Sequence, residues 1–150
     1  MSELRFERLD GGSGDLLAED WRRVHNEVVP THPLSPRDVR ERAGRHHLEV
    51  AYLGDAPVGC STVRPPTEER PDTATVIARV LPPYRRRGYG GELYARGVAV
   101  ARGTGAAALE TVVLASDGDG LRFALGHGFT EVERYLLDGD TIPWIDLRLT

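Results

Sequence analysis

Lysine is missing from this 150-residue sequence, so all 19 of its basic residues are arginines. Without lysine the chain cannot form a Schiff base, and it cannot build a P-loop, whose phosphate ligand is a lysine. A GC-rich genome would explain the preference for arginine codons. Both exclusions hold whatever its origin.

Cysteine occurs once, as Cys60, which excludes a disulfide within the chain and a paired-cysteine metal site. We expect Cys60 to be a small core residue. No apolar run approaches the ~18 residues that span a bilayer. Charges throughout residues 1–10 do not fit a signal peptide. The sequence therefore predicts a cytoplasmic protein with no membrane partner.

The formal net charge of −4 argues against a general nucleic-acid binder. A chain of this length fits one domain, which buries roughly 70% of its unfolded surface and needs no metal to fold. No group of Cys, His and Asp residues has the spacing of metal ligands, so we predict no metal site. His25, His32, His46 and His47 are expected to be structural or solvated, and Trp21 and Trp144 to be core residues.

Hydrophobic periodicity predicts the order of elements along the chain. Leu17, Trp21, Val24 and Val28 recur at helical spacing. Segment 35–38 carries a capping-box pattern, with a serine, a proline and an aspartate in the order that starts a helix. We predict strands at 4–9, 48–53, 58–63, 73–81, 109–115, 129–137 and 142–149 and helices at 17–28, 35–44, 89–102 and 117–125.

This order predicts one α/β (α+β) domain over residues 1–150. Its central mixed sheet has about seven strands and is accompanied by about four helices. An antiparallel meander comes first, and helical crossovers follow.

Segment 80–91 carries the strongest functional signal. A strand ends, Pro82-Pro83 breaks it, and the chain turns through Gly88, Gly90 and Gly91 into a helix. A helix start offers unpaired backbone N–H groups and a partial positive charge, and glycine lets a ligand approach the backbone. Arginines in the turn add donors suited to phosphate. Together these features predict an anion site with room for a pyrophosphate.

Two other interpretations of the turn remain open. A dinucleotide-binding fingerprint requires GxGxxG, but Leu93 stands where the third glycine belongs. The turn would also be a simple tight turn if its arginines were merely solvated.

The segment resembles the GNAT superfamily of N-acetyltransferases, whose pattern V-x-P-x-x-R-x-x-G-x-G/A marks a strand-to-helix junction. Val80, Pro82, Arg85, Gly88 and Gly90 match it in register. The later segment 121–129, which ends in Gly-Phe, is also similar to the family, and the order of elements agrees over nearly the whole chain.

The resemblance implies acetyl-CoA as cosubstrate, its pyrophosphate held by the turn and its pantetheine arm paired with the strand ending at Val80. That strand would splay from the strand at 109–115 to form a cleft. The implied cofactor-binding residues are Val80, Arg85, Arg86, Arg87, Gly88, Tyr89, Gly90, Gly91 and Asp117.

The chain departs from the family at both usual acid and base positions. No glutamate lies on the strand leading into the turn, and Ala124 stands where a tyrosine often protonates the thiolate. Asp117 replaces the common asparagine and also fits a helix N-cap. Glu49, Ser116 and Tyr135 are alternative candidates, although Glu49 and Tyr135 would also fit solvent-facing strand positions. The catalytic residues are therefore unknown at this stage.

The sequence predicts an acyltransferase that moves an acetyl group directly to the amine of a small-molecule or peptide acceptor. The alternative is a catalytically weak acyl-CoA-binding or regulatory module. Neither the acceptor, nor the length of the acyl group, nor the homodimer common in the family can be fixed from sequence. The net charge leans slightly toward a cationic acceptor.

Overall fold

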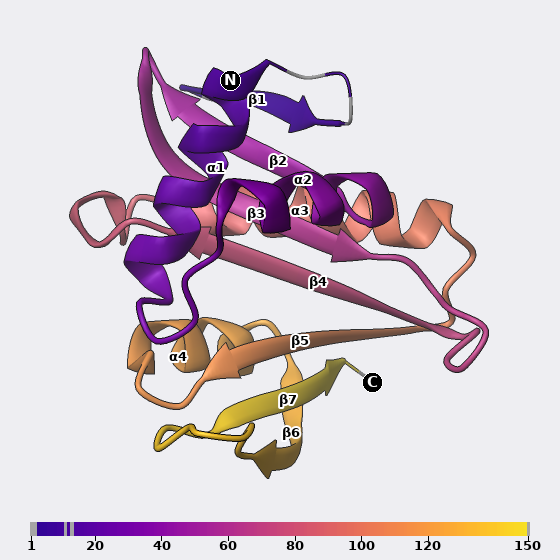
Figure 1. The fold of residues 1–150 in the computed structure, drawn as a ribbon. Coiled ribbons are helices and arrows are strands. Elements are labelled where there is room, and N and C mark those ends of the chain that lie inside the picture. Colours follow the sequence, from indigo (N-terminus) through magenta and orange to yellow (C-terminus); the bar gives the residue numbers. More distant parts are fainter. Residues whose placement is uncertain (1–2, 11, 13, 150) are drawn as a thin grey trace.

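The strands form one sheet in the order β1-β2-β3-β4-β5-β7-β6. The structure is a computed structural model that describes residues 3–10, 12 and 14–149. The strands are β1 (Leu4–Leu9), β2 (His47–Leu53), β3 (Ala56–Arg64), β4 (Thr73–Val80), β5 (Ala108–Leu114), β6 (Phe129–Tyr135) and β7 (Trp144–Leu149). The helices are α1 (Asp15–Val28), α2 (Pro36–Arg45), α3 (Tyr89–Gly103) and α4 (Gly118–Gly126), with a 3-10 turn, η1, at Pro82–Tyr84. The predicted fold class is confirmed (Figure 1).

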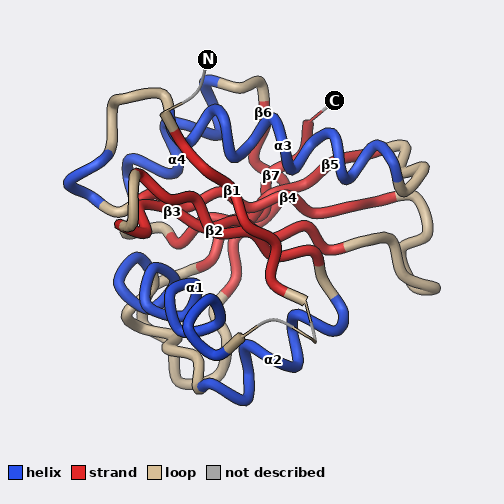
Figure 2. The backbone as a smooth tube through the Cα atoms, turned by 90° about the horizontal axis from the view of Figure 1, so that it is seen from above, coloured by secondary structure: helices blue, strands red, loops and turns tan. Residues whose placement is uncertain are grey.

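The sheet separates two layers of helices. Figure 2 shows α1 and α2 below the sheet and α3 and α4 above it. Strands β1 to β4 pair antiparallel in sequence order, as the predicted meander requires. The crossover through α3 makes β4 and β5 parallel neighbours. We call the two sides of the sheet the α1/α2 face and the α3/α4 face.

Local sequence signals set the helix ends. Ser35 accepts a hydrogen bond from the backbone N–H of Asp38, and the Asp38 carboxylate accepts one from the Ser35 N–H. This is the predicted capping box. Gly97 lies in the interior of α3, where a Cβ atom would come within 2.6 Å of Val76 Cγ1. The missing side chain therefore lets α3 pack closely on β4, at a helix-propensity cost of about 1 kcal/mol.

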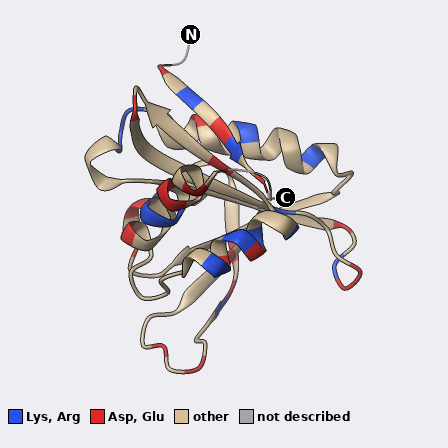
Figure 3. Cartoon of the chain, turned by 45° about the horizontal axis from the view of Figure 1, so that its top comes forward, with Lys and Arg blue, Asp and Glu red and all other residues tan. Residues whose placement is uncertain are grey.

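Charged and apolar residues alternate on β1, as the sequence predicted. Leu4 and Leu9 are buried, while Arg5, Glu7 and Arg8 are exposed. Figure 3 shows basic and acidic residues interspersed along this strand. Leu4 and Leu9 are five residues apart and point to opposite faces of the sheet: Leu4 packs in the cluster with Leu93 of α3, and Leu9 packs in the core under α1 and α2.

The predicted bounds of the last two strands were too generous. Pairing of β6 with β7 ends at Tyr135 and Trp144, not at residues 137 and 142. Leu136 and Leu137, predicted to lie in a strand, are 57% and 48% exposed. Pro143 has no N–H to contribute to a ladder, so β7 begins after it.

Candidate active site

Strands β4 and β5 separate within the sheet. They pair only through Thr73–Thr75 and Ala108–Glu110. Beyond that point Val76–Val80 and Thr111–Leu114 have no ladder partner across the gap, and Figure 1 shows the strands diverging. A cavity of about 410 Å³ occupies the space between them. The splayed strand pair implied by the family resemblance is present.

The walls of this cavity come from both faces of the sheet. Val29 and Trp144 line it on the α1/α2 face, and Tyr94 and Phe123 line it on the α3/α4 face. The cavity therefore gives two molecules access to one gap from opposite sides. Such an arrangement suits a transfer between two bound substrates.

The turn before α3 adjoins this cavity and has an unusual backbone. Arg86 and Gly88 both have positive φ, 65° and 84°. A positive φ is uncommon for a non-glycine residue, and it turns successive backbone N–H groups toward a common point. Gly88 is the N-cap of α3, and no side chain caps this helix end. The N–H groups of the first turn are therefore available to an anion.

The three arginines of the turn lie in different environments. Arg85 donates to the backbone oxygen of Val80 at 2.8 Å and to Asp119 at 3.1 Å, so its guanidinium ties the turn to β4 and α4. Arg86 and Arg87 are exposed, and neither has a carboxylate partner among the described residues. The Arg87 guanidinium lies over the Tyr84 ring, with its Cζ 5.7 Å from the ring centroid, and neither side chain is held by a carboxylate that would compete with phosphate groups.

The remaining predicted cofactor residues surround the same opening. Gly90 faces Phe123, and Gly91 has open space where a Cβ atom would stand. The Tyr89 hydroxyl is directed elsewhere, since it donates to Glu3 at 2.7 Å. Asp117 accepts a hydrogen bond from the Gly120 N–H at 3.0 Å and is the predicted N-cap of α4. These four residues line the cavity together with Val80 at the end of β4.

None of the three alternative bases lies in the cavity. Glu49, a candidate base that would also have fitted a solvent-facing position, is only 4% exposed and lies on the α3/α4 face. It accepts hydrogen bonds from Arg96 and His47 at 2.8 and 2.6 Å. Burial raises its pKa, but these hydrogen bonds outweigh that effect and lower the pKa. Glu49 is therefore a structural ion-pair residue.

Ser116 is exposed at the end of β5 and does not line the cavity. Tyr135 donates its hydroxyl hydrogen bond to Asp146 at 3.0 Å. Burial, with the neighbouring Asp146 charge, raises the pKa of Tyr135 to about 12. The carboxylates that line the cavity, among described residues, are Asp117 and Asp119, and Asp119 is paired with Arg85 and Arg122. No free carboxylate stands ready as a base.

Two cavity residues escaped the sequence analysis. Tyr94 packs against Phe123 and Phe129 and beside Ala124, the position where the family often has a tyrosine. Burial raises the pKa of Tyr94, which keeps its phenol protonated. Its helical spacing of four from Gly90 was an available signal. Arg79, on β4, is the second, and no local pattern distinguished it.

The residues expected to be structural have that role. Cys60 and Trp21 are fully buried, and Trp144 is 9% exposed. His25 stacks on Trp21, with ring centroids 5.4 Å apart. Within residues 3–10, 12 and 14–149, no group of side chains could hold a metal ion, and no helix is long and apolar enough to cross a bilayer.

Comparison with known proteins agrees with this geometry. A sequence model described as the acetyltransferase (GNAT) family matches residues 15–129. No curated protein sequence matches the chain.

Solved structures share the fold at low sequence identity. A provisionally assigned phosphinothricin N-acetyltransferase has a TM-score of 0.75 at 18% identity, with 97% of each chain covered. The Salmonella typhimurium protein yncA, solved with its cofactor acetyl-CoA, has a TM-score of 0.72 at 14% identity, covering 99% of this chain and 94% of its own. Ribosomal-protein-alanine N-acetyltransferase from Brucella melitensis has a TM-score of 0.72 at 16% identity, covering 96% and 98%.

The TM-scores of these structures establish a common fold. The family match establishes kinship over most of the chain. With the split between β4 and β5 and the open helix start beside it, they lead to one assignment: the chain belongs to the GNAT acetyltransferase family, whose cosubstrate is acetyl-CoA.

Proposed function

We propose that this protein transfers the acetyl group of acetyl-CoA directly to the amine of an acceptor, without a covalent enzyme intermediate. The observation that carries this proposal is the cavity at the β4–β5 split, which begins at the uncapped start of α3 and reaches the α1/α2 face. One substrate would enter beside the turn and the other from the opposite face.

In this proposal the backbone N–H groups of Arg86 to Gly91 hold the pyrophosphate, with Arg86 and Arg87 adding charge. The unpaired edge of β4 is suited to hydrogen-bond the pantetheine arm, as a neighbouring strand would. Arg85 and Asp117 act mainly by fixing the turn and the start of α4. The fit rests on open backbone donors rather than on a prebuilt side-chain pocket.

Direct transfer is favoured because the cavity offers no activated nucleophile. Cys60 is fully buried, and burial raises the pKa of its thiol to about 12. In the proposed reaction the neutral amine attacks the thioester carbonyl carbon, the nitrogen gives its extra proton to water, the C–S bond breaks, and the thiolate takes a proton. A backbone N–H at the split would stabilise the oxyanion. Tyr94 is the protonated side chain best placed to give that proton.

Gly91→Glu tests the binding site without straining the backbone. Position 91 is the third residue of α3, where glutamate suits a helix start, and open space surrounds its Cβ position. The added carboxylate would repel the pyrophosphate by several kcal/mol, since two charges about 4 Å apart at an effective dielectric of 20 interact by about 4 kcal/mol. We expect acetyl-CoA to bind about 100-fold more weakly to this variant.

The measurement is the rise in melting temperature with acetyl-CoA, with Gly91→Ala as the matched neutral control. Wild type and the alanine variant should be stabilised alike, and the glutamate variant should not be. Equal stabilisation of all three would overturn the assignment of the site.

The alternative drawn from the sequence is a catalytically weak acyl-CoA-binding or regulatory module. An assay of CoA release with a panel of amines distinguishes it from the transferase. Release that depends on the amine rejects it. Acetyl-CoA binding without any release would favour it over the transferase. Cytoplasmic location and a homodimer stay predictions.

A further inference from the structure

Six arginines of the described chain are at least partly withdrawn from solvent. They are Arg22, Arg42, Arg64, Arg79, Arg85 and Arg148. Three have carboxylate partners, namely Glu19 for Arg22, Asp119 for Arg85 and Glu110 for Arg148. The guanidinium groups of Arg42, Arg64 and Arg79 make no ion pair or hydrogen bond within the described residues.

The three unpaired arginines share one face of the sheet. Arg79 pairs in register with Cys60, which packs in the core under α1 and α2. Arg64 follows Cys60 by four residues on β3, so it points to the same α1/α2 face. Arg42 comes from α2, which covers this face (Figure 2). We call these three residues the arginine cluster.

Electrostatics shows that the members of the cluster act on one another. Burial, with the charges of Arg64 and Arg42, lowers the pKa of Arg79 to about 10. Burial and the Arg42 charge also lower the pKa of Arg64. With a pKa of about 10, Arg79 remains charged at neutral pH. Arginine side chains are in general not deprotonated in proteins. The cluster therefore concentrates positive charge in a partly desolvated site.

The histidines that face the cluster do not neutralise it. Burial and Arg79 lower the pKa of His25 to about 4, and burial and Arg64 lower that of His46 to about 4, so both rings are neutral. The carboxylates Asp117, which acts on Arg79, and Asp38 and Glu41, which act on Arg42, form no ion pair with these arginines within the described residues. Arg64 feels the more distant charge of Asp146, which already accepts a hydrogen bond from Tyr135.

Three buried side-chain atoms of the described chain also lack a partner: Arg64 Nε, His46 Nδ1 and Trp144 Nε1, of which only Trp144 belongs to a residue that lines the cavity. Buried polar atoms and charges are normally satisfied, because leaving them unpaired costs free energy. An anion bound in the cavity would meet the unpaired Arg79 and the unpartnered Trp144 N–H, and Arg64 would add its charge from outside the cavity.

Arg79 lines the cavity beside Trp144, on the side from which the acceptor would enter. We propose that the acceptor is a small amine that also carries an anionic oxyacid group, and that Arg79, supported by Arg64 and Arg42, binds that group. This rests on the proposed acetyl transfer, whose acceptor class it names. It reverses the slight preference for a cationic acceptor drawn from the net charge.

The cluster would also help to solve the problem of the missing base. An amine must be neutral to attack the thioester, and nearby positive charges favour the neutral form of an ammonium group. The acceptor would lose its proton to water more readily than it does in solution.

The test compares acceptors that differ only in the anionic group. The panel contains the twenty protein amino acids, their carboxamides and 2-aminoethylphosphonate beside ethylamine. One readout is kcat/KM for CoA release, and the other is the rise in melting temperature when each compound is added to the CoA complex. We expect the carboxylate or phosphonate forms to exceed their neutral counterparts by about 100-fold in kcat/KM. Comparing the preference for amino acids over their carboxamides with the preference for 2-aminoethylphosphonate over ethylamine distinguishes a carboxylate site from a phosphonate site.

Three variants locate the effect. Arg79→Gln should lose about 100-fold in kcat/KM for the anionic amine, change little for the neutral one, and keep the acetyl-CoA shift. Arg42→Gln should show a smaller loss of the same kind. Arg37→Gln, an exposed arginine on the same helix as Arg42, is the matched control and should match wild type.

The outcomes separate this proposal from the proposed function. Binding of anionic amines that depends on Arg79, without CoA release, would support the anion site and count against the transferase. Equal use of neutral and anionic amines, or an unchanged preference in Arg79→Gln, would overturn the anion site while leaving acetyl transfer intact. Failure of every panel compound to bind the CoA complex would also overturn it.

Discussion

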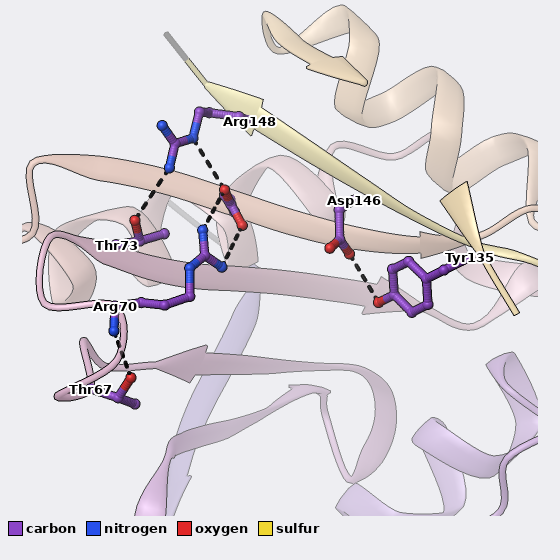
Figure 4. A network of polar contacts seen from close by, with 7 residues as sticks. Thr67, Arg70, Thr73, Tyr135, Asp146 and Arg148 are labelled. Carbon is purple, nitrogen blue, oxygen red and sulfur yellow. Dashed lines mark hydrogen bonds and ion pairs between the residues drawn. The ribbon is translucent and has the colours of Figure 1, made fainter. Parts of the chain in front are cut away.

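The two ends of the β4–β5 pair use arginine in opposite ways. At the paired end Glu110 accepts two hydrogen bonds from Arg70, at 2.9 and 2.8 Å, and one from Arg148 at 3.1 Å. Figure 4 shows this network, with Arg148 also reaching Thr73. At the split end Arg79, the member of the arginine cluster that lines the cavity, has no such carboxylate. We call the first site the clamp.

The difference lies in what each site has to do. The clamp crosses β4, β5 and β7 at the last paired residues, so it ties the strands together where the ladder exists. Past it the strands part, and an arginine paired within the protein there would not be available to a ligand. Satisfied guanidinium groups stabilise the fold, and unsatisfied ones in a cavity indicate a binding site.

The largest effect should come from breaking the clamp. Glu110→Ala removes three charge-assisted hydrogen bonds from a side chain that is 9% exposed. We expect a loss of about 3 kcal/mol in the free energy of unfolding, limited because Arg70 and Arg148 are half exposed and regain water.

Urea unfolding measures this loss, with Glu131→Ala as the control. Glu131 also accepts two hydrogen bonds from an arginine, Arg134, but that pair is exposed and should contribute far less. Equal losses in both variants would show that the clamp is an ordinary surface pair.

The clamp should also give stability a specific pH dependence. Hydrogen bonds from Arg70 lower the pKa of Glu110 below its usual range, against the opposing effect of burial. A carboxyl group with a lowered pKa stabilises the fold above its unfolded pKa of about 4.3, and this contribution is lost as pH falls through the folded value. The stability difference between wild type and Glu110→Gln should be about 2 kcal/mol near pH 6 and shrink below pH ~4. A difference that stays constant to pH 3 would contradict this.

Much of this molecule could be read from local sequence. Alternation on β1, the capping box at Ser35 and the turn through Gly88 are local features, and each lies where the pattern put it. Such features depend on neighbours within four residues of the chain, which the sequence displays directly.

The arginine cluster and the clamp could not be read in that way. Arg42, Arg64 and Arg79 come from three elements and meet only because of strand register and the placement of α2. Glu110 was treated as part of an ordinary buried strand, because its partners lie 40 and 38 residues away. Whether a buried charge is paired is a property of tertiary structure, and it decides the role of each residue.

At the split end, Tyr94→Phe should slow the reaction without weakening binding. If the phenol gives a proton to the thiolate, its loss removes general-acid catalysis, which commonly contributes 100-fold or more. Water can reach the gap from both faces, so we expect a smaller loss, about 10-fold in kcat. The rise in melting temperature with acetyl-CoA should not change. If Tyr94 had only a structural role, Tyr94→Phe would change the melting temperature of the unliganded protein and leave the pH profile of kcat unchanged.

The smallest effect is also the one that distinguishes the two ends most directly. Arg79→Gln removes a partly buried charge that has no partner and is repelled by Arg64 and Arg42. Replacing an uncompensated charge with a neutral side chain should raise the free energy of unfolding of the unliganded protein by about 1 kcal/mol. Arg148→Gln, at the clamp, should instead lower it by about 1 kcal/mol, because it deprives Glu110 of a partner. Urea unfolding without ligands measures both. If Arg79→Gln destabilised the protein as Arg148→Gln does, Arg79 would be part of the scaffold, and the contrast between a satisfied and an unsatisfied end of the strand pair would fail.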